Sequence, residues 1–192
     1  MTNPRAVWDG KINAMTITVL PGRHEVLSER DIALVTLLGS CVAACIRDPR
    51  LGLGGLNHFL LPGDDSNGDG SARYGVNAME LLINDILRRG GKKSRLEAKV
   101  FGGANVIDVN SSQTVGNRNA SFVLEFLKRE GIPVLAQDLG GQRGRRIFYF
   151  PSTGRASVLM LRETETRRVN RNELPLIKTP NPASRAGAVE LF

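Results

Sequence analysis

The sequence predicts a layered α+β, or mixed α/β, domain. Apolar runs that resemble strands lie before residue 62 and again after residue 131. Two stretches in which apolar residues have helical spacing lie between these groups. The hydrophobic content of 41%, with only 5% aromatic residues, is enough for a packed core of Leu, Val, Ile and Ala. Strand groups on both sides of helices in the sequence are typical of layered domains.

The first third of the chain is expected to be mostly β-structure. Residues 1–14 are polar, and we expect them to form a flexible N-terminal segment. Residues 15–20 alternate like a strand and stop at a Pro-Gly turn signal, and residues 32–36 form a second apolar strand. Residues 42–46 are apolar throughout, so periodicity does not distinguish strand from helix there. Residues 51–61 begin rich in glycine and end strand-like.

Two helices are expected in the middle of the chain. In the first, residues 76–87, the apolar side chains fall on one face, and the glycines after Arg89 suit its C-terminus. Asn119 is expected to cap the second helix, which ends at Gly131. Further strands are expected at residues 96–101, 132–136, 146–150 and 156–161.

Regular periodicity is lost from about residue 164. Prolines and mixed charges follow, so we expect residues 164–192 to form a mobile C-terminal tail. The folded domain is therefore expected to span residues 15–163, and a chain of 192 residues suits one such domain.

The charge and the apolar content limit the class of partner. The net charge is +7, and basic residues gather in small groups, as at residues 88–95 and 143–146. Such groups can bind nucleic acid, attract an acidic protein surface, or form an ordinary solvated surface. No zinc-finger or RNA-recognition signature accompanies them, so we expect no nucleic-acid partner.

The sequence predicts a cytoplasmic protein without membrane insertion. The longest apolar run, residues 32–46, is shorter than the roughly 18–20 residues of a membrane span. The first residues lack the apolar core of a signal peptide. The two cysteines, Cys41 and Cys45, lie too close in sequence to make a disulfide framework.

Cys41 is the candidate nucleophile. It follows Gly39-Ser40 at the end of an apolar run, and glycine permits a tight backbone bend. On such a bend, neighbouring backbone N–H groups can face the same point as the sulfur, as a tetrahedral oxyanion requires. A small buried hydrophobe is the competing interpretation of a free cysteine. Cys45 lacks the glycine bend and is expected to be structural.

His58 is the candidate general base, since the chain has only two histidines and His24 lies in a polar segment. Adjacent strands could place His58 beside Cys41, and an imidazole lowers a thiol pKa and carries protons. Thr36 could orient the ring. Gly39, Ser40 and Asn57 are the candidates for oxyanion or substrate binding.

A metal site or a cofactor is not expected. Cys41, Cys45 and His58 could supply three ligands, but no Cys-x-x-Cys pair or second histidine cluster accompanies them. Residues 65–70 mimic the start of a calcium loop, yet Val76 stands where a bidentate Glu is needed.

Six motifs, in order, resemble the CheD family of chemoreceptor glutamine deamidases. The resemblance spans about residues 15–163, and Gly-Ser-Cys with His-x-x-Leu-Pro at this separation is its most specific part. The motifs are Thr36-Leu-Leu-Gly-Ser-Cys-Val-Ala-Ala, Gly55-Leu-Asn-His-Phe-Leu-Leu-Pro, Lys99-Val-Phe-Gly-Gly-Ala-Asn, Gly116-Asn-Arg-Asn, Asp138-Leu-Gly-Gly and Arg145-Arg-Ile-Phe-Tyr-Phe.

The resemblance implies a function and a site. Members hydrolyse glutamine side-chain amides on methyl-accepting chemotaxis receptors, which leaves glutamate and ammonia. Cys41 matches the family's nucleophile, His58 its general base and Thr36 its third site residue. The implied fold has a β-sandwich-like core flanked by helices, similar to toxin-type cysteine deamidases. Some members also bind a CheC-type phosphatase.

Two other functions remain open from the sequence. The chain could be a non-catalytic chemotaxis adaptor on the same fold, which binds receptors or a CheC-type phosphatase. It could also be a different thiol amidohydrolase, such as a peptidase, because the same Cys–His chemistry cleaves backbone amides.

Overall fold

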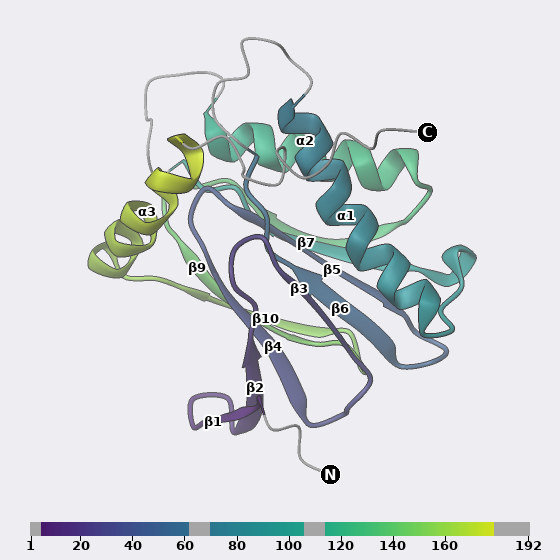
Figure 1. The fold of residues 1–192 in the computed structure, drawn as a ribbon. Helices are drawn as coiled ribbons and strands as arrows, with labels where there is room; N and C mark the ends of the chain where they lie inside the picture. The colour runs from purple at the N-terminus through teal and green to yellow at the C-terminus, as the bar shows by residue number, and fades with distance from the viewer. Residues whose placement is uncertain (1–4, 62–69, 106–113, 179–192) are drawn as a thin grey trace, which may run out of the picture.

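The fold consists of two five-stranded sheets and three α-helices, in a computed structural model that describes residues 5–61, 70–105 and 114–178. The sheets stack face to face, and helices α1 (Gly70–Arg88) and α2 (Val115–Arg129) cover the free face of one of them (Figure 1). The layered α+β architecture predicted from the sequence is therefore confirmed. Helix α3 (Glu163–Lys178) lies at one end of the layers, near the point where the fourth strand ends.

The sheet between the helices and the other sheet is called the central sheet. Its strand order is β3-β6-β5-β7-β8, and only β7 and β8 pair in parallel. Its strands are β3 (His24–Leu27), β5 (Val42–Asp48), β6 (Leu53–Asn57), β7 (Glu97–Gly102) and β8 (Val134–Leu139).

The second sheet, called the outer sheet, has the order β1-β2-β4-β9-β10, and only β2 and β4 pair in parallel. Its strands are β1 (Val7–Asp9), β2 (Ala14–Thr18), β4 (Ile32–Leu38), β9 (Arg145–Phe150) and β10 (Arg155–Met160). A short 3-10 helix, η1 (Lys93–Arg95), precedes β7.

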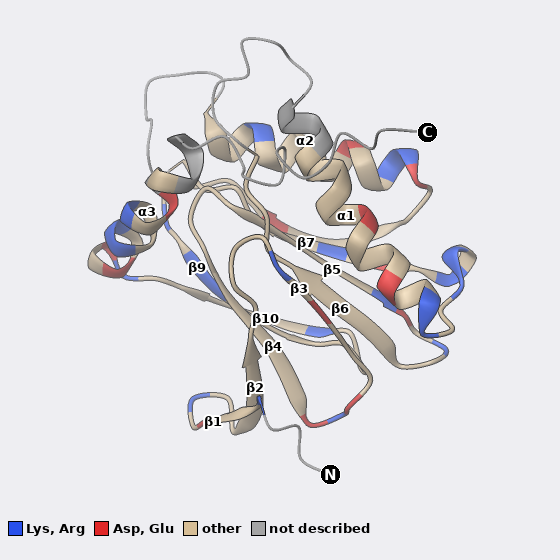
Figure 2. Cartoon of the chain, viewed as in Figure 1, with Lys and Arg blue, Asp and Glu red and all other residues tan. Residues whose placement is uncertain are grey.

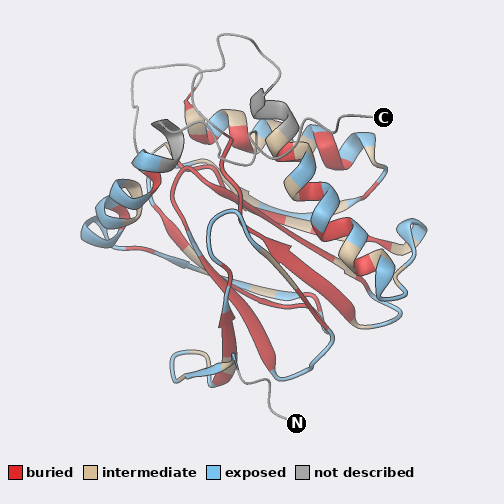
Figure 3. Ribbon diagram, in the orientation of Figure 1, coloured by how far each residue is buried: buried red, intermediate tan, exposed pale blue. Residues whose placement is uncertain are grey.

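The inner strands β5 and β6 of the central sheet are buried on both faces (Figure 3). Val42, Ala44 and Ile46 of β5 pack toward the helices, where Met79, Leu82, Ile86, Val123 and Leu127 complete one core. Ala43 and Cys45, on the alternate face of β5, join a second core against the outer sheet. A strand covered on both faces is apolar at every position, which explains why periodicity left residues 42–46 undecided.

The two chain ends differ from the sequence-based expectation. Residues 7–9, expected within a flexible segment, form β1 and pair with β2. Residues 164–178, expected within a mobile tail, belong to helix α3, whose inward-facing side chains Thr166 and Glu173 are buried. The buried positions within residues 163–173 are polar, so hydrophobic periodicity gave no sign of them. The calcium-like stretch at 65–70 and residues 179–192 lie largely or wholly outside the described residues.

The start of α2 was also predicted wrongly. Thr114 is the N-cap, and its Oγ1 accepts a hydrogen bond from the backbone N–H of Asn117 at 3.2 Å. The predicted cap, Asn119, is fully buried one turn further along the helix. Strand β3 was not predicted, because His24–Leu27 is too short and too polar to show alternation.

Figure 2 shows basic residues distributed over several surfaces instead of one continuous patch. Several of them have structural partners. Arg145, although almost completely buried, contacts the Asp138 carboxylate and the Gly140 carbonyl. Arg89 donates to the Val26 carbonyl at 2.9 Å. Part of the positive charge therefore holds loops in place. Among the described residues, no helix is both long and apolar enough to cross a membrane.

Asp48 anchors the end of β5 to the segment before β7. Its buried carboxylate accepts hydrogen bonds from the Arg95 guanidinium, from Lys92 N at 3.0 Å and from Arg50 N at 3.0 Å. The hydrogen bond of Arg95, together with these N–H groups and against the effect of burial, lowers the pKa of Asp48 from 3.8 to about 2. The folded state therefore favours the ionised carboxylate.

We predict that Asp48→Asn destabilises the protein by about 2 kcal/mol at neutral pH. Because the folded-state pKa is depressed, this contribution is present above the ordinary pKa of 3.8 and is lost as the pH falls toward 2. Denaturant unfolding of both proteins at several pH values measures it. A difference in unfolding free energy that does not shrink in acid would contradict the assignment.

Candidate active site

The chain bends sharply between β4 and β5, at Gly39-Ser40-Cys41. All three backbone carbonyls of the bend accept a hydrogen bond from a neighbouring segment. Gly39 O accepts from Ala104 N at 2.8 Å, Ser40 O from the Asn119 side chain at 2.8 Å, and Cys41 O from Gly103 N at 2.7 Å. With the carbonyls fixed on one side, the three N–H groups face the other side together. Such a run of N–H groups is an anion-binding concavity.

His58 lies next to this bend because β6 runs antiparallel to β5. The pairing continues past the end of β6, where Val42 and Phe59 exchange two hydrogen bonds of 3.0 Å. Cys41 and His58 flank this bridge diagonally, and both side chains point to the face opposite Val42 and Phe59, so they are neighbours on one face. Both are buried, with exposed fractions of 0% for Cys41 and 3% for His58.

Thr36 reaches the same point from the outer sheet. Its hydroxyl donates to Val19 O at 2.8 Å and lies 2.7 Å from Nδ1 of His58. A hydroxyl has one hydrogen to donate, so Nδ1–H of His58 donates to Thr36 Oγ1. This assignment leaves Nε2 of His58 without a proton and with no hydrogen-bond partner within the described structure.

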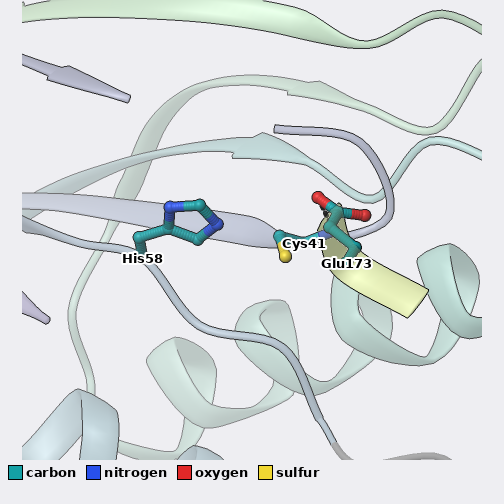
Figure 4. Close-up of side chains that lie close together, drawn as sticks. All are labelled: Cys41, His58 and Glu173. Carbon is teal, nitrogen blue, oxygen red and sulfur yellow. Dashed lines mark hydrogen bonds between the residues drawn. The ribbon is translucent and has the colours of Figure 1, made fainter. Parts of the chain in front are cut away.

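Helix α3 brings a carboxylate to the bend. Glu173 Oε1 accepts from Gly39 N at 2.9 Å, and Oε2 accepts from Ser40 N at 2.8 Å and from Ser40 Oγ at 2.7 Å. Cys41 N lies further away, at 3.5 Å from Oε1. Figure 4 shows the Nε2 edge of His58 directed toward Cys41, with the Glu173 carboxylate on the opposite side of Cys41. One ligand atom from each of the three residues lies within 4.8 Å of the others.

The environment keeps both reactive groups neutral. Burial raises the pKa of the Cys41 thiol well above its ordinary value, and the negative charge of Glu173 raises it further. Burial lowers the pKa of His58 from 6.5 to about 4, although the Glu173 charge and the Val19 carbonyl favour the charged ring. The thiol and the imidazole therefore face one another uncharged, with the acceptor nitrogen available.

A pocket of about 200 Å³ opens beside His58. Its lining comes from the segment after β2, from β4 and from α3, and includes Thr36, His58, Val169, Asn172 and Glu173. A larger hollow of about 540 Å³ lies elsewhere, near Trp8 and Phe150, and is lined by neither cysteine nor histidine. The smaller pocket is the one lined by His58, Thr36 and Glu173, while Cys41 lies beneath its lining residues with no exposed surface.

Cys41, His58 and Glu173 are also residue types that bind metal ions. Ligands of one tetrahedral zinc ion lie about 3.5 Å apart. The ligand atoms of Cys41, His58 and Glu173 lie within 4.8 Å of one another, a range that includes the zinc spacing, but both oxygens of the carboxylate already accept hydrogen bonds from the bend. This arrangement favours a thiol–imidazole pair over a metal centre.

The structure brings together Thr36, Gly39, Ser40, Cys41 and His58, as the sequence analysis expected. It does not place Asn57 with them. Asn57 Oδ1 accepts from Ala44 N at 2.9 Å, and Nδ2 donates to Ala78 O at 3.1 Å. Neighbouring residues of a strand point to opposite faces, so the Asn57 side chain faces α1 while His58 faces the site.

Two site residues escaped the sequence analysis. Asn119 links the segments that carry Cys41 and His58, because it donates to Ser40 O and accepts from Leu61 N at 2.8 Å. Asn119 belongs to the Gly-Asn-Arg-Asn motif, but the sequence predicts a helix cap there and gives no sign of these contacts. Glu173 stands in a polar segment with no motif, so no local signal pointed to it.

Comparison with known proteins identifies the family. A buried thiol and imidazole beside converging N–H groups is an arrangement suited to acyl transfer through cysteine. Residues 60–160 match the family described as CheD chemotactic sensory transduction. A probable chemoreceptor glutamine deamidase CheD of Bordetella petrii is 52% identical over 82% of this chain and 71% of its own length.

Two further relatives agree. Probable chemoreceptor glutamine deamidases CheD of Rhodopseudomonas palustris and Agrobacterium fabrum are 50% and 47% identical. The alignments cover 96% and 93% of this chain, and 87% and 97% of the relatives. The chain therefore belongs to the CheD family. Among solved structures, Neisseria meningitidis protein NMB0706 aligns over 68% of this chain and 64% of its own, with a TM-score of 0.41 and 11% identity.

We predict that His58 is neutral at about pH 6 and carries its proton on Nδ1. Nitrogen-15 NMR of histidine-labelled protein distinguishes the two ring nitrogens and follows the titration. The midpoint is expected at about 4, because burial lowers the pKa of the ring. A midpoint near the ordinary value of 6.5, or a proton on Nε2, would contradict the described hydrogen-bond arrangement.

Proposed function

We propose that this protein hydrolyses the side-chain amide of specific glutamines on methyl-accepting chemotaxis receptors, which yields glutamate and ammonia. One observation carries the proposal: the thiol of Cys41, the imidazole of His58 and the N–H groups of one backbone bend converge within a few ångströms. The names of the relatives supply the substrate class. The receptors' cytoplasmic helices are the expected partners, so the protein is expected to act in the cytoplasm.

The reaction would begin with proton transfer from Cys41 to His58. The neutral imidazole has an unprotonated Nε2 directed toward the cysteine, while Nδ1 is held by Thr36. As the sulfur attacks the side-chain carbonyl carbon of glutamine, Nε2 takes the thiol proton. Thr36 has a positioning role, because it fixes the tautomer and the plane of the ring.

The backbone bend would stabilise the tetrahedral intermediate. The attacked carbonyl oxygen becomes negative, and the N–H groups of Gly39, Ser40 and Cys41 already converge on a carboxylate oxygen pair in this structure. Fixed donors of this kind are among the largest contributions to acyl-transfer catalysis. Collapse of the intermediate breaks the C–N bond, and the imidazolium donates its proton to the departing amine, which leaves as ammonia.

Hydrolysis of the thioester would complete the cycle. A water molecule gives a proton to His58 and attacks the thioester carbonyl, and the second tetrahedral intermediate expels the sulfur, which recovers its proton from the ring. The substrate residue is then a glutamate. Every step uses only water and the side chains and backbone of this chain.

We predict that Cys41→Ala and His58→Ala each reduce receptor deamidation by several orders of magnitude. The chain supplies matched controls, because Cys45→Ala removes the other thiol and His24→Ala the other imidazole. Cys45 lies in the core between the sheets, and His24 lies on β3 with Nε2 at 3.6 Å from an Asp85 oxygen. Both controls should retain activity.

Peptide mass spectrometry of a receptor cytoplasmic fragment is the measurement. Deamidation leaves the peptide chain intact and raises the mass of single glutamine-containing peptides, whereas a peptidase would cut the chain. Full activity of Cys41→Ala would contradict the mechanism. A cellular chemotaxis effect that survives in this variant, without deamidation, would favour a non-catalytic adaptor that binds receptors or a CheC-type phosphatase.

We predict that Thr36→Val lowers kcat about 10- to 100-fold with little change in KM, as for other residues that orient a reacting group. The variant removes the oxygen that accepts the hydrogen bond of Nδ1. Thr36→Ser keeps the hydroxyl and should restore most of the rate. Equal rates in the valine and serine variants would mean that the hydroxyl does not act on the ring.

A further inference from the structure

The candidate active site already contains an occupant from the same chain. Glu173 of α3 places its carboxylate on the N–H groups of Gly39 and Ser40 and on the Ser40 hydroxyl, at 2.7–2.9 Å. The residue is only 3% exposed. A side-chain carboxylate of glutamate is also the group that the proposed reaction produces. The occupant is therefore chemically the same as the product.

The position of this carboxylate leaves no room for a substrate amide. A Cβ atom added at Gly39 would lie 2.8 Å from Oε2 and 3.1 Å from Oε1 of Glu173. The carboxylate thus fills the space that the missing side chain of Gly39 leaves at the bend. A substrate carbonyl that used the same N–H groups would have to displace it, because each donor directs one hydrogen.

The first eleven residues of helix α3, 163–173, are held mainly by polar contacts, which suits an element that can leave. Among them, the buried or half-buried residues are Thr166, Val169, Asn170 and Glu173, of which Val169 is the apolar one. Thr166 Oγ1 accepts from Gly144 N at 3.2 Å, and Glu173 makes the contacts with the bend. Over residues 163–173, little apolar surface opposes release, since hydrophobic stabilisation scales with the apolar area buried. The carboxylate contact is the strongest hold, because hydrogen bonds to charged groups exceed neutral ones.

We propose that Glu173 acts as a built-in product-like ligand of the active site, so that helix α3 has to leave before a receptor helix can present its glutamine to Cys41. The proposal rests on the proposed function for the identity of the displaced substrate. It assigns the N–H groups of Gly39 and Ser40, with the Ser40 hydroxyl, as the subsite for the substrate carbonyl.

The charge of Glu173 and the space that its side chain occupies both suppress the reactivity of Cys41. Placed beside the thiol, it opposes formation of the thiolate, as expected for two negative charges in a buried site. Docked α3 therefore both covers Cys41 and keeps it protonated. Release of the helix removes both effects at once.

Thiol alkylation tests the cover without any receptor. Full-length wild type, Glu173→Ala and Glu163→Ala are treated with iodoacetamide, and peptide mass spectrometry follows labelling of Cys41 and Cys45 separately. Glu163 is the matched control, because it is a glutamate of the same helix whose side chain is 78% exposed. We expect Cys41 of Glu173→Ala to react at least about tenfold faster than in wild type, and Glu163→Ala to match wild type.

Cys45 reports on folding in the same experiment. It is buried between the sheets, so its labelling should stay slow in all three proteins unless the fold opens. Equal Cys41 rates in wild type and Glu173→Ala would overturn the proposal. Faster labelling of Cys41 and Cys45 together would also overturn it, because general unfolding would then explain the result.

A second variant tests the product-like placement. In Glu173→Gln, the side-chain amide stands where the carboxylate lies, so Cys41 should attack it within the same chain. Water replaces the amine, ammonia leaves, and residue 173 becomes glutamate, which mass spectrometry detects. The double variant Glu173→Gln with Cys41→Ala should keep its introduced glutamine. If Glu173→Gln protein deamidates a receptor fragment but retains its own introduced amide, the placement is wrong.

Failure of this inference and failure of the proposed function give different results. If Cys41 labelling accelerates in Glu173→Ala but no variant deamidates a receptor fragment, helix α3 covers the thiol and the proposed function is wrong. If the receptor fragment is deamidated at the same rate by wild type and Glu173→Ala, with equal labelling, the function stands and the inhibitory role is wrong.

Discussion

The site depends on how the backbone is held at Gly39-Ser40-Cys41. Each carbonyl of this bend accepts a hydrogen bond from a different neighbour: Ala104 N, the Asn119 side chain and Gly103 N. Because the carbonyls are fixed on one side, the N–H groups are directed to the other, beside the cysteine sulfur. The polypeptide thereby creates an anion-binding surface without a charged side chain. The thiol, the imidazole and the carboxylate of α3 are all arranged around that surface.

The layered fold buries the bend between its elements and brings together site residues from distant segments of the chain. The central sheet supplies Cys41 and His58, the outer sheet supplies Thr36, and α2 reaches through with Asn119. Buried polar groups require hydrogen-bond partners, and the side chains of Thr36, Ser40, Asn119 and Glu173 have them. Nε2 of His58 has none within the described structure, and it is the atom proposed to accept the thiol proton.

Burial shifts the pKa values of Cys41 and His58 in opposite directions, and both shifts favour the neutral form of the group. It raises the pKa of Cys41 and lowers that of His58, so both are neutral when α3 is docked. Glu173 satisfies the N–H groups of the bend in this state, and its charge disfavours the thiolate. These contacts are consistent with a resting state in which α3 protects the thiol. In the proposed model, a substrate carbonyl would compete with the Glu173 carboxylate for the N–H groups of the bend.

The sequence by itself determined the layered α+β class, most strands, both central helices, and the grouping of Cys41, His58 and Thr36, because apolar periodicity and short motifs are local properties. Only the tertiary structure decided that residues 42–46 are a strand, that Asn57 faces away from the site, and that Asn119 braces the bend. It also brought Glu173 to Gly39 across 134 positions of sequence. A contact between a polar helix face and distant backbone N–H groups has no periodicity of its own, so it becomes visible only once the chain is folded.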